Sequence, residues 1–246
     1  MSQAVTAILY APGTNCHEET AAAIELAGGR TELVLLRDLL DGQTRLEKYQ
    51  AAVIPGGFSY GDHLGAGRIF ATMLVARLRD QLVEFLEARK PLLGVCNGFQ
   101  VLTEAGILPG RTPGNRGMAL LEIESAHFED RKVRLAVSAE KCLWTENLAG
   151  QILGMPTAHA EGRPLFCETG ASGAARVVFR YSDAQGRPTL DYPSNPNGAP
   201  GAVAGVTDET GLVLGLMPHP ERASLPAHYS QDGLKLFNNL IRWLFR

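Results

Sequence analysis

The sequence predicts an α/β fold whose central sheet is mostly parallel, with antiparallel strands added to it. In the first half, short apolar segments alternate with helical patterns, which is the order of βαβ units. In the second half, several apolar segments follow one another between glycines and prolines, and a helical pattern returns only near the end. A chain of 246 residues is long enough to bury a sizeable core. We therefore expect one domain that spans residues 1–246.

The first half supplies the parallel strands. A buried strand over residues 5–10 ends at a Pro-Gly pair, and the helical pattern 18–27 stops at a Gly-Gly pair. The longest helical pattern is 68–89, where apolar residues recur near one face until Pro91 ends it. The last helix of this half is predicted to begin with residues 99–105. The remaining strands of this half are predicted at 32–36, 51–54 and 92–95.

The second half predicts added strands and one closing helix on the same domain. Residues 232–245 carry an amphipathic stripe of Leu, Ile and Phe, which predicts a helix. Residues 194–201 are rich in Pro, Gly and Asn, which predicts a loop. The strands are predicted at 120–125, 133–138, 176–181, 203–206 and 212–217.

Composition excludes several classes of function. The net charge of −3 gives no basic footprint for nucleic acid. The four cysteines include no C-x-x-C pair, so zinc spacing is absent and reduced thiols are expected. The N-terminus lacks a basic region and a signal-length apolar run, and no apolar stretch is long enough to span a membrane. We expect a cytoplasmic protein that holds no metal and binds neither nucleic acid nor membrane.

The segment G-V-C-N-G places Cys96 between Gly94 and Gly98, directly after the strand at 92–95. This is the nucleophile-elbow pattern, in which a strand turns sharply into a helix and flanking side chains would collide with the turn. The new helix points its free N–H groups at the sulfur, which favours the thiolate. A buried structural cysteine is the alternative, but the two glycines and the strand-to-helix switch favour a nucleophile.

His219 is the best candidate for the general base. It follows the strand at 212–217 in the sequence M-P-H-P-E-R, where prolines on both sides disfavour a helix. Glu221, two residues later, is placed to orient the imidazole, which completes a Cys-His-Glu triad with Cys96. His159 is the strongest rival, because Glu161 repeats the same two-residue spacing. The alternative interpretations are a hydrogen-bonded core histidine for His219 and an ordinary solvated carboxylate for Glu221.

The glycine-rich segment P-G-G-F-S-Y-G-D follows the strand at 51–54, at the sheet edge where active sites of parallel sheets lie. We expect the backbone N–H groups of Gly57 and Asn97 to form an oxyanion hole for a tetrahedral intermediate. A flexible surface loop is the alternative. The segment is not a P-loop, since no G-K-[ST] follows, and no G-x-G-x-x-G follows the first strand.

These residues together resemble the class I (triad) glutamine amidotransferases, whose two defining blocks look like G-V-C-N-G-F-Q and P-H-P-E-R in this chain. The match narrows to the glutaminase subunits of phosphoribosylformylglycinamidine synthases. Further blocks of that branch occur in order, namely A-P-G-T-N-C, P-G-G-F-S-Y-G-D, A-H-A-E-G-R and N-P-N-G-A. The resemblance implies a three-layer, flavodoxin-like fold with added antiparallel strands. Departures from the branch pattern fall in loops and leave the triad untouched.

The resemblance also implies roles. Cys96 is the nucleophile, His219 the general base and acid, Glu221 its orienting partner, Gly57 and Asn97 the oxyanion donors, and Gln100 a residue that holds the substrate. L-Glutamine is hydrolysed to glutamate and ammonia through a cysteine thioester. The ammonia supplies an ATP-using synthetase subunit that converts formylglycinamide ribonucleotide to formylglycinamidine ribonucleotide in purine biosynthesis. No cofactor is expected here, because ATP and magnesium belong to that partner, and a small accessory subunit is a further candidate partner.

Three questions stay open at this point. A stand-alone thiol hydrolase on a related fold, such as a γ-glutamyl peptidase, is the rival enzyme, and an inactive regulatory subunit is the rival binding protein. The A-H-A-E-G-R block, with His159 and Glu161, is either a coupling face for the synthetase or a structural turn. Cys16 is either buried in the core or part of the pocket.

Overall fold

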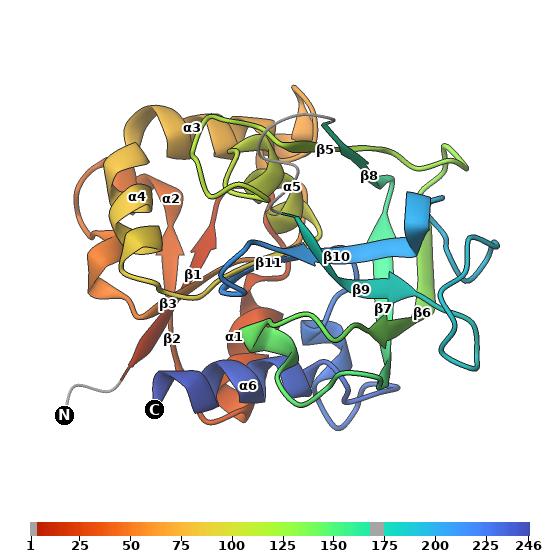
Figure 1. Cartoon of the computed structure of the whole chain (residues 1–246). Helices are drawn as coiled ribbons and strands as arrows, with labels where there is room; N and C mark the ends of the chain where they lie inside the picture. Colours follow the sequence, from red (N-terminus) through yellow and green to blue (C-terminus); the bar gives the residue numbers. More distant parts are fainter. Residues whose placement is uncertain (1–3, 168–174) are drawn as a thin grey trace.

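The computed structural model describes residues 4–167 and 175–246 and has a mixed sheet at its centre (Figure 1). The order of the nine strands in this sheet, within the described residues, is β2-β1-β3-β4-β11-β10-β9-β6-β7. The strands from β2 to β11 run parallel, and those from β11 to β7 run antiparallel. The parallel strands are β1 (Val5–Tyr10), β2 (Arg30–Leu35), β3 (Ala51–Ile54), β4 (Leu92–Val95) and β11 (Val213–Leu216).

The antiparallel part continues the same sheet and adds a separate two-stranded ribbon, in which β5 pairs with β8. This ribbon and the end of β7 bring the A-H-A-E-G-R block close to the carboxyl ends of the parallel strands, as the cavity described below shows. The strands of this part are β5 (Met118–Glu122), β6 (Glu129–Val137), β7 (Ile152–His159), β8 (Glu161–Phe166), β9 (Arg176–Tyr181) and β10 (Val203–Thr207).

Helices cover both faces of the parallel strands, which gives the three layers expected from the sequence. Figure 1 shows α1 and α6 together on one side and α3, α4 and α5 on the other. None of the described helices is long and apolar enough to cross a membrane. The helices are α1 (His17–Leu26), α2 (Leu36–Leu40), α3 (Arg68–Arg77), α4 (Arg79–Glu87), α5 (Asn97–Glu104) and α6 (Leu234–Leu244).

The core lies between the parallel strands and these helices. The strand side chains there are aliphatic and almost fully buried, as at Ile8, Val53 and Leu214, and the helices contribute Phe70 and Phe99. Burying each such side chain contributes roughly 1.5–3 kcal/mol to stability. The continuous apolar runs of β3, β4 and β11 are therefore explained by burial on both faces of the sheet.

One prediction about the elements was wrong, and two strands were missed. The helix expected over 68–89 is two helices, because Leu78 leaves the helical conformation (φ −124°, ψ 16°). Leu78 is itself buried, and the bend allows Phe70 on α3 and Phe85 on α4 both to stay in the core. No strand was predicted over the A-H-A-E-G-R block, which contains the end of β7, a bend at Ala160 and the start of β8.

The topology brings the predicted nucleophile and base together. β4 and β11 are hydrogen-bonded parallel neighbours, with Val95 opposite Leu216. Cys96 follows the first strand directly, and His219 lies three residues past the end of the second. The backbone N–H of Cys96 donates to the carbonyl of Leu216 at 2.8 Å, so the ladder continues up to the nucleophile itself.

Candidate active site

Cys96 occupies a strained elbow between β4 and α5. Its φ of 50° and ψ of −107° lie in a region that residues with a side chain rarely adopt. A Cβ on Gly94 would lie 2.5 Å from the carbonyl oxygen of Gly98, and a Cβ on Gly98 would overlap that of Ile54. Both glycines are thus required by backbone contacts, which is the reason why the elbow pattern was visible in the sequence.

His219 and Glu221 form a buried pair. The imidazole Nδ1 lies 2.6 Å from the Oε1 of Glu221. The exposed fractions of the two side chains are 3% for His219 and 0% for Glu221. The backbone N–H of His219 donates to the carbonyl of Pro156 on β7 at 2.8 Å, which fixes the residue against the antiparallel part. The other ring nitrogen, Nε2, is buried and has no hydrogen-bond partner among the described residues.

The electrostatics of His219 suit an acid–base role. Burial opposes a charge on this ring, but the Glu221 carboxylate and the Cys96 sulfur outweigh it and hold the pKa of His219 well above its ordinary value. The Cys96 sulfur is therefore close enough to the imidazole to influence its protonation. The elbow sulfur and the imidazole, 123 residues apart by their numbers 96 and 219, meet as the sequence predicted.

A cavity of about 250 Å³ opens beside these groups, and both Cys96 and His219 line it. Its walls combine the elbow, the loop after β1, the glycine-rich loop after β3 and the ends of β7 and β8. The other lining residues are Asn15, Cys16, Gly57, Phe58, Asp62, Ala66, Gln100, Phe128, Asp130, Ala158, His159, Ala160, Glu161 and Arg222.

The glycine-rich loop lies tightly against the site. Gly57 has a φ of 143°, and a Cβ there would lie 2.7 Å from the backbone N of Asn15. The two loops are joined by hydrogen bonds from the N–H groups of Asn15 and Phe58, a pattern that does not use the N–H of Gly57. A Cβ on Gly56 would lie 2.7 Å from the Cε1 of His219, so this glycine forms one wall of the imidazole's site.

The side chains of Asn97 and Gln100 connect α5 to its surroundings. Asn97 accepts a hydrogen bond from the N–H of Ser59 at 3.1 Å and donates to Asp62 at 3.1 Å, which ties the glycine-rich loop to the elbow. Gln100 accepts from Asn97 at 3.0 Å and donates to the carbonyl of Glu161 at 2.8 Å. The amide of Gln100, predicted to hold substrate, is thus already engaged with the chain at the edge of the cavity.

His159 does not form the rival base that its spacing from Glu161 predicted. Its Nδ1 lies 2.7 Å from the hydroxyl of Thr157, and no carboxylate of the described residues pairs with the ring. Burial, with a smaller contribution from the charge on His219, lowers the pKa of His159 to about 3. The ring is only 3% exposed and lines the cavity, so its side chain is not part of an exposed coupling face.

Two groups of cavity residues were missed or left open by the sequence. Cys16 is buried, with its sulfur 4.0 Å from the Nδ1 of His219 and 3.3 Å from an Arg222 nitrogen. Burial raises the pKa of this thiol. Asp62 and Glu161 line the cavity as well, and burial raises the pKa of both carboxyl groups. For Cys16, the sequence offered one signal of a place in the pocket: the residue comes just after the loop that follows the first strand.

Comparison with known proteins places this chain among glutamine amidotransferases. The family described as CobB/CobQ-like glutamine amidotransferase domain matches residues 3–244. The phosphoribosylformylglycinamidine synthase subunit PurQ of Dehalococcoides mccartyi is 39% identical over 254 residues, covering 99% of this chain and 98% of the relative. The PurQ subunit of Pyrococcus furiosus is 42% identical over 241 residues, covering 97% of each.

Solved structures agree with the sequence relatives. A chain of PurLQS from Thermotoga maritima is 31% identical, with a TM-score of 0.80 over 98% of this chain and 99% of that one. A glutamine amidotransferase from the same organism shares 15% identity and the fold, with a TM-score of 0.60 over 99% of each chain. The chain therefore belongs to the PurQ family of phosphoribosylformylglycinamidine synthase subunits, within the CobB/CobQ-like glutamine amidotransferases.

Proposed function

We propose that the cavity beside Cys96 is the glutaminase site, and that Cys96, His219 and Glu221 hydrolyse L-glutamine to glutamate and ammonia. One observation carries the proposal: a sulfur and an imidazole from two adjacent parallel strands line one cavity, and a buried carboxylate lies 2.6 Å from the far ring nitrogen. This is the arrangement that nucleophilic catalysis by a cysteine requires.

In the first step, the Cys96 thiolate attacks the side-chain amide carbon of glutamine. The carbonyl oxygen becomes an oxyanion, which the N–H groups of Gly57 and Asn97 stabilise. The protonated His219, which Glu221 favours, gives its Nε2 proton to the amide nitrogen. The carbon–nitrogen bond then breaks, ammonia leaves, and a γ-glutamyl thioester remains on Cys96 beside a neutral imidazole.

In the second step, the neutral His219 takes a proton from water at Nε2, and the water oxygen attacks the thioester carbon. The same two N–H groups hold the second oxyanion. The carbon–sulfur bond breaks, which releases glutamate and returns Cys96 to the thiolate and His219 to its charged form. Glu221 keeps the ring oriented through both steps by accepting the Nδ1 proton in a hydrogen bond.

The far end of the cavity suits the α-amino group of glutamine. Asp62 and Glu161 line it, and burial disfavours their charged forms, so a bound ammonium group would compensate them. Gln100 shapes this end, because its amide holds both Asn97 and the backbone of Glu161. The resemblance implied that Gln100 helps to hold the substrate, and here it would do so indirectly, by supporting the acidic wall.

The ammonia is passed to a synthetase subunit that binds ATP and magnesium, with a small accessory subunit in the same cytoplasmic complex. The solved relative from Thermotoga maritima comes from PurLQS, which supports such an assembly here. The cavity's rim offers a contact surface: Phe58 is 48% exposed and Phe128 53% exposed, with ring centroids 6.4 Å apart. Aromatic side chains are enriched at protein–protein interfaces.

Replacement of Cys96 by alanine tests the assignment. In the presence of the synthetase, Cys96→Ala is expected to lower glutamine-dependent ammonia release by at least about 10³-fold, as loss of a nucleophile does in triad enzymes. Cys167→Ala, at an exposed cysteine away from the cavity, serves as the control and should retain full activity. An electrophilic glutamine analogue should label Cys96 in the unaltered chain and leave Cys16 unlabelled.

Undiminished ammonia release by Cys96→Ala would reject the proposed site. Full glutamine hydrolysis by the unaltered chain in the absence of the synthetase would instead favour the stand-alone thiol hydrolase. Absence of labelling together with absence of activity would favour the regulatory subunit.

A further inference from the structure

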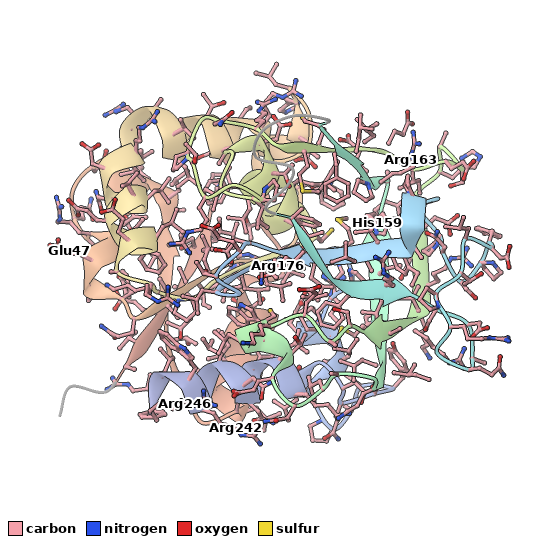
Figure 2. The ribbon with its side chains drawn as sticks, in the orientation of Figure 1. Glu47, His159, Arg163, Arg176, Arg242 and Arg246 are labelled. Atoms are coloured by element: carbon pink, nitrogen blue, oxygen red, sulfur yellow. The ribbon has the colours of Figure 1, made fainter. Side chains whose placement is uncertain are left out.

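A series of buried polar side chains ends at the cavity. It begins at Asn197 and passes through Tyr181 on β9 and Thr157 on β7 to His159. All four side chains are at most 3% exposed. Figure 2 labels His159 within the body of the molecule, beside the ribbon of β7. The last atom of this series, Nε2 of His159, is buried and has no partner in the described part of the protein.

The orientation of the first group in this series is fixed. The Nδ2 of Asn197 donates to the carbonyl of Gly162 at 2.9 Å, while its Oδ1 accepts from the N–H of Ala199 at 3.1 Å. The amide nitrogen, which can donate hydrogen bonds but not accept them, also lies 3.4 Å from the Tyr181 oxygen. The tyrosine oxygen is therefore an acceptor toward Asn197. Burial raises the pKa of Tyr181, so its own hydrogen stays on the oxygen.

The remaining hydrogen bonds of this series then have one arrangement in which every hydroxyl hydrogen has an acceptor. Thr157 interacts with Tyr181 and lies 2.7 Å from the Nδ1 of His159, so in this arrangement the Tyr181 hydroxyl donates to Thr157 and the Thr157 hydroxyl donates to Nδ1. In the reverse arrangement, Tyr181 would accept from both neighbours and leave its own buried hydrogen without an acceptor. With Nδ1 as the acceptor, a neutral His159 carries its hydrogen on Nε2.

We infer that His159 presents this Nε2–H as a fixed donor to the small lone-pair molecule beside Cys96, first the departing ammonia and then the attacking water. The inference rests on the glutaminase function proposed above. Three positions support it: His159 lines the cavity with Cys96, its ring lies close enough to His219 to feel that charge, and the neighbouring Ala158 carbonyl lies 3.5 Å from the Cys96 sulfur.

The chemistry fits both molecules. Ammonia has a free lone pair once the carbon–nitrogen bond has broken, and it accepts the hydrogen bond without being protonated, because a neutral imidazole keeps its hydrogen. Water has two lone pairs, so one can accept from His159 while the other attacks the thioester and a proton passes to His219. His159 thus binds the small molecule and transfers no proton. Thr157 and Tyr181 are positioning residues that set its tautomer.

The tautomer itself is the first test. In the full chain labelled with ¹⁵N at histidine, long-range proton–nitrogen couplings distinguish a ring with its hydrogen on Nε2 from one with it on Nδ1. We expect His159 to be in the Nε2–H form and to stay neutral between about pH 5 and 8, where an ordinary histidine titrates. A ring with its hydrogen on Nδ1, or a ring that gains a proton in this range, would overturn the inference.

The second test uses two pairs of variants in complex with the synthetase. His159→Leu should lower kcat for glutamine about 10- to 100-fold with KM little changed, because the lost donor contacts the reacting molecules and not glutamine itself. His159→Gln, whose amide N–H can take the place of Nε2–H, should recover part of that loss. Thr157→Val should lower kcat severalfold, and Thr145→Val, at a buried threonine outside the cavity, should not.

Labelling of Cys96 by the electrophilic glutamine analogue separates this inference from the proposed function. Normal labelling of His159→Leu with a reduced kcat supports the donor role. Normal labelling with an unchanged kcat overturns it. Failure to label Cys96 in the unaltered chain would reject the proposed function and this inference with it. If His159→Leu does not fold, the Thr157→Val pair and the tautomer measurement still decide the question.

Discussion

Two buried imidazoles share one cavity and have opposite chemistry. His219 follows β11 in the parallel part, and His159 ends β7 in the antiparallel part. Both leave Nε2 without a partner in the described chain, and both are almost fully buried. The pKa of His219 is held well above its ordinary value, whereas the pKa of His159 falls to about 3. Burial acts in the same direction on both rings, so it is not the source of the difference.

The group behind Nδ1 accounts for the difference. His219 has a carboxylate at 2.6 Å, which stabilises a positive ring, and His159 has a hydroxyl at 2.7 Å, which does not. A carboxylate therefore makes a proton carrier of one ring, and a hydroxyl leaves the other neutral. The comparison teaches that the same residue type, at the same burial, takes its role from one atom of its neighbour.

Removal of that carboxylate should make His219 resemble His159, with the largest effect among the three changes that follow. In Glu221→Gln, burial remains and the opposing charge is lost, so the pKa of His219 should fall. As the pH rises, the charged imidazole that protonates the leaving nitrogen then loses its proton at a lower pH than in the unaltered enzyme. The basic limb of the pH–rate profile should therefore move to lower pH. At neutral pH we expect kcat to drop by about 10²- to 10⁴-fold, the upper value being that of the orienting carboxylate of a serine triad.

Steady-state glutaminase assays across the pH range, with the synthetase present, would measure both effects. Glu19→Gln, at a carboxylate that pairs with Arg222 at 2.8 Å and is 45% exposed, is a suitable control. A Glu221→Gln profile with the same limbs as the unaltered enzyme would show that Glu221 does not set the charge on His219.

A methyl group in the wall of the imidazole's site should have an intermediate effect. In Gly56→Ala, the new Cβ would lie 2.7 Å from the Cε1 of His219, so the ring has to move away from Cys96 or Glu221. We expect kcat to fall by about 10²-fold, which is the cost of a misplacement near 1 Å. Gly154→Ala is the matched control, because its Cβ would meet neighbours at an ordinary 3.7 Å. Equal activity of the two variants would show that the ring is free to shift without loss.

Loss of the second thiol in the cavity should have the smallest effect. The Cys16 sulfur lies 4.0 Å from the Nδ1 of His219, and burial raises the pKa of this thiol, so it stays neutral and supplies no charge. We expect Cys16→Ala to change kcat by less than about fivefold, equivalent to about 1 kcal/mol. Glutamine hydrolysis at matched protein concentrations would test this. A loss comparable to that of Glu221→Gln would make Cys16 a partner of the imidazole in its own right.

The sequence predicted those features whose cause is local. The strands β1, β3 and β4 begin and end where the apolar runs do, since each run is buried on both faces and is bounded by proline or glycine. The elbow was visible because Gly94 and Gly98 are both forced by nearby backbone. His219 and Glu221 were visible because two residues suffice to make the pair.

Features that depend on distant contacts were beyond the sequence. Thr157 and Tyr181 lie on separate strands, so the partner of His159 could not be inferred from the A-H-A-E-G-R block, where Glu161 was the apparent candidate. The strands of that block were also missed, because Gly154 and Pro156 interrupt the apolar alternation of β7. The break at Leu78 was invisible for a similar reason, since the apolar stripe continues through it without change.

The hydrogen-bonded ladder between β4 and β11 has a consequence for regulation. It fixes the Cys96 sulfur and the His219 imidazole at the ends of two neighbouring strands in the middle of the sheet. Separating them would require breaking the hydrogen bonds between two fully buried strands. We therefore do not expect activity to be regulated by separating the sulfur from the imidazole. We therefore expect a docked subunit to control activity at the rim of the cavity, where the Phe58 and Phe128 side chains are exposed.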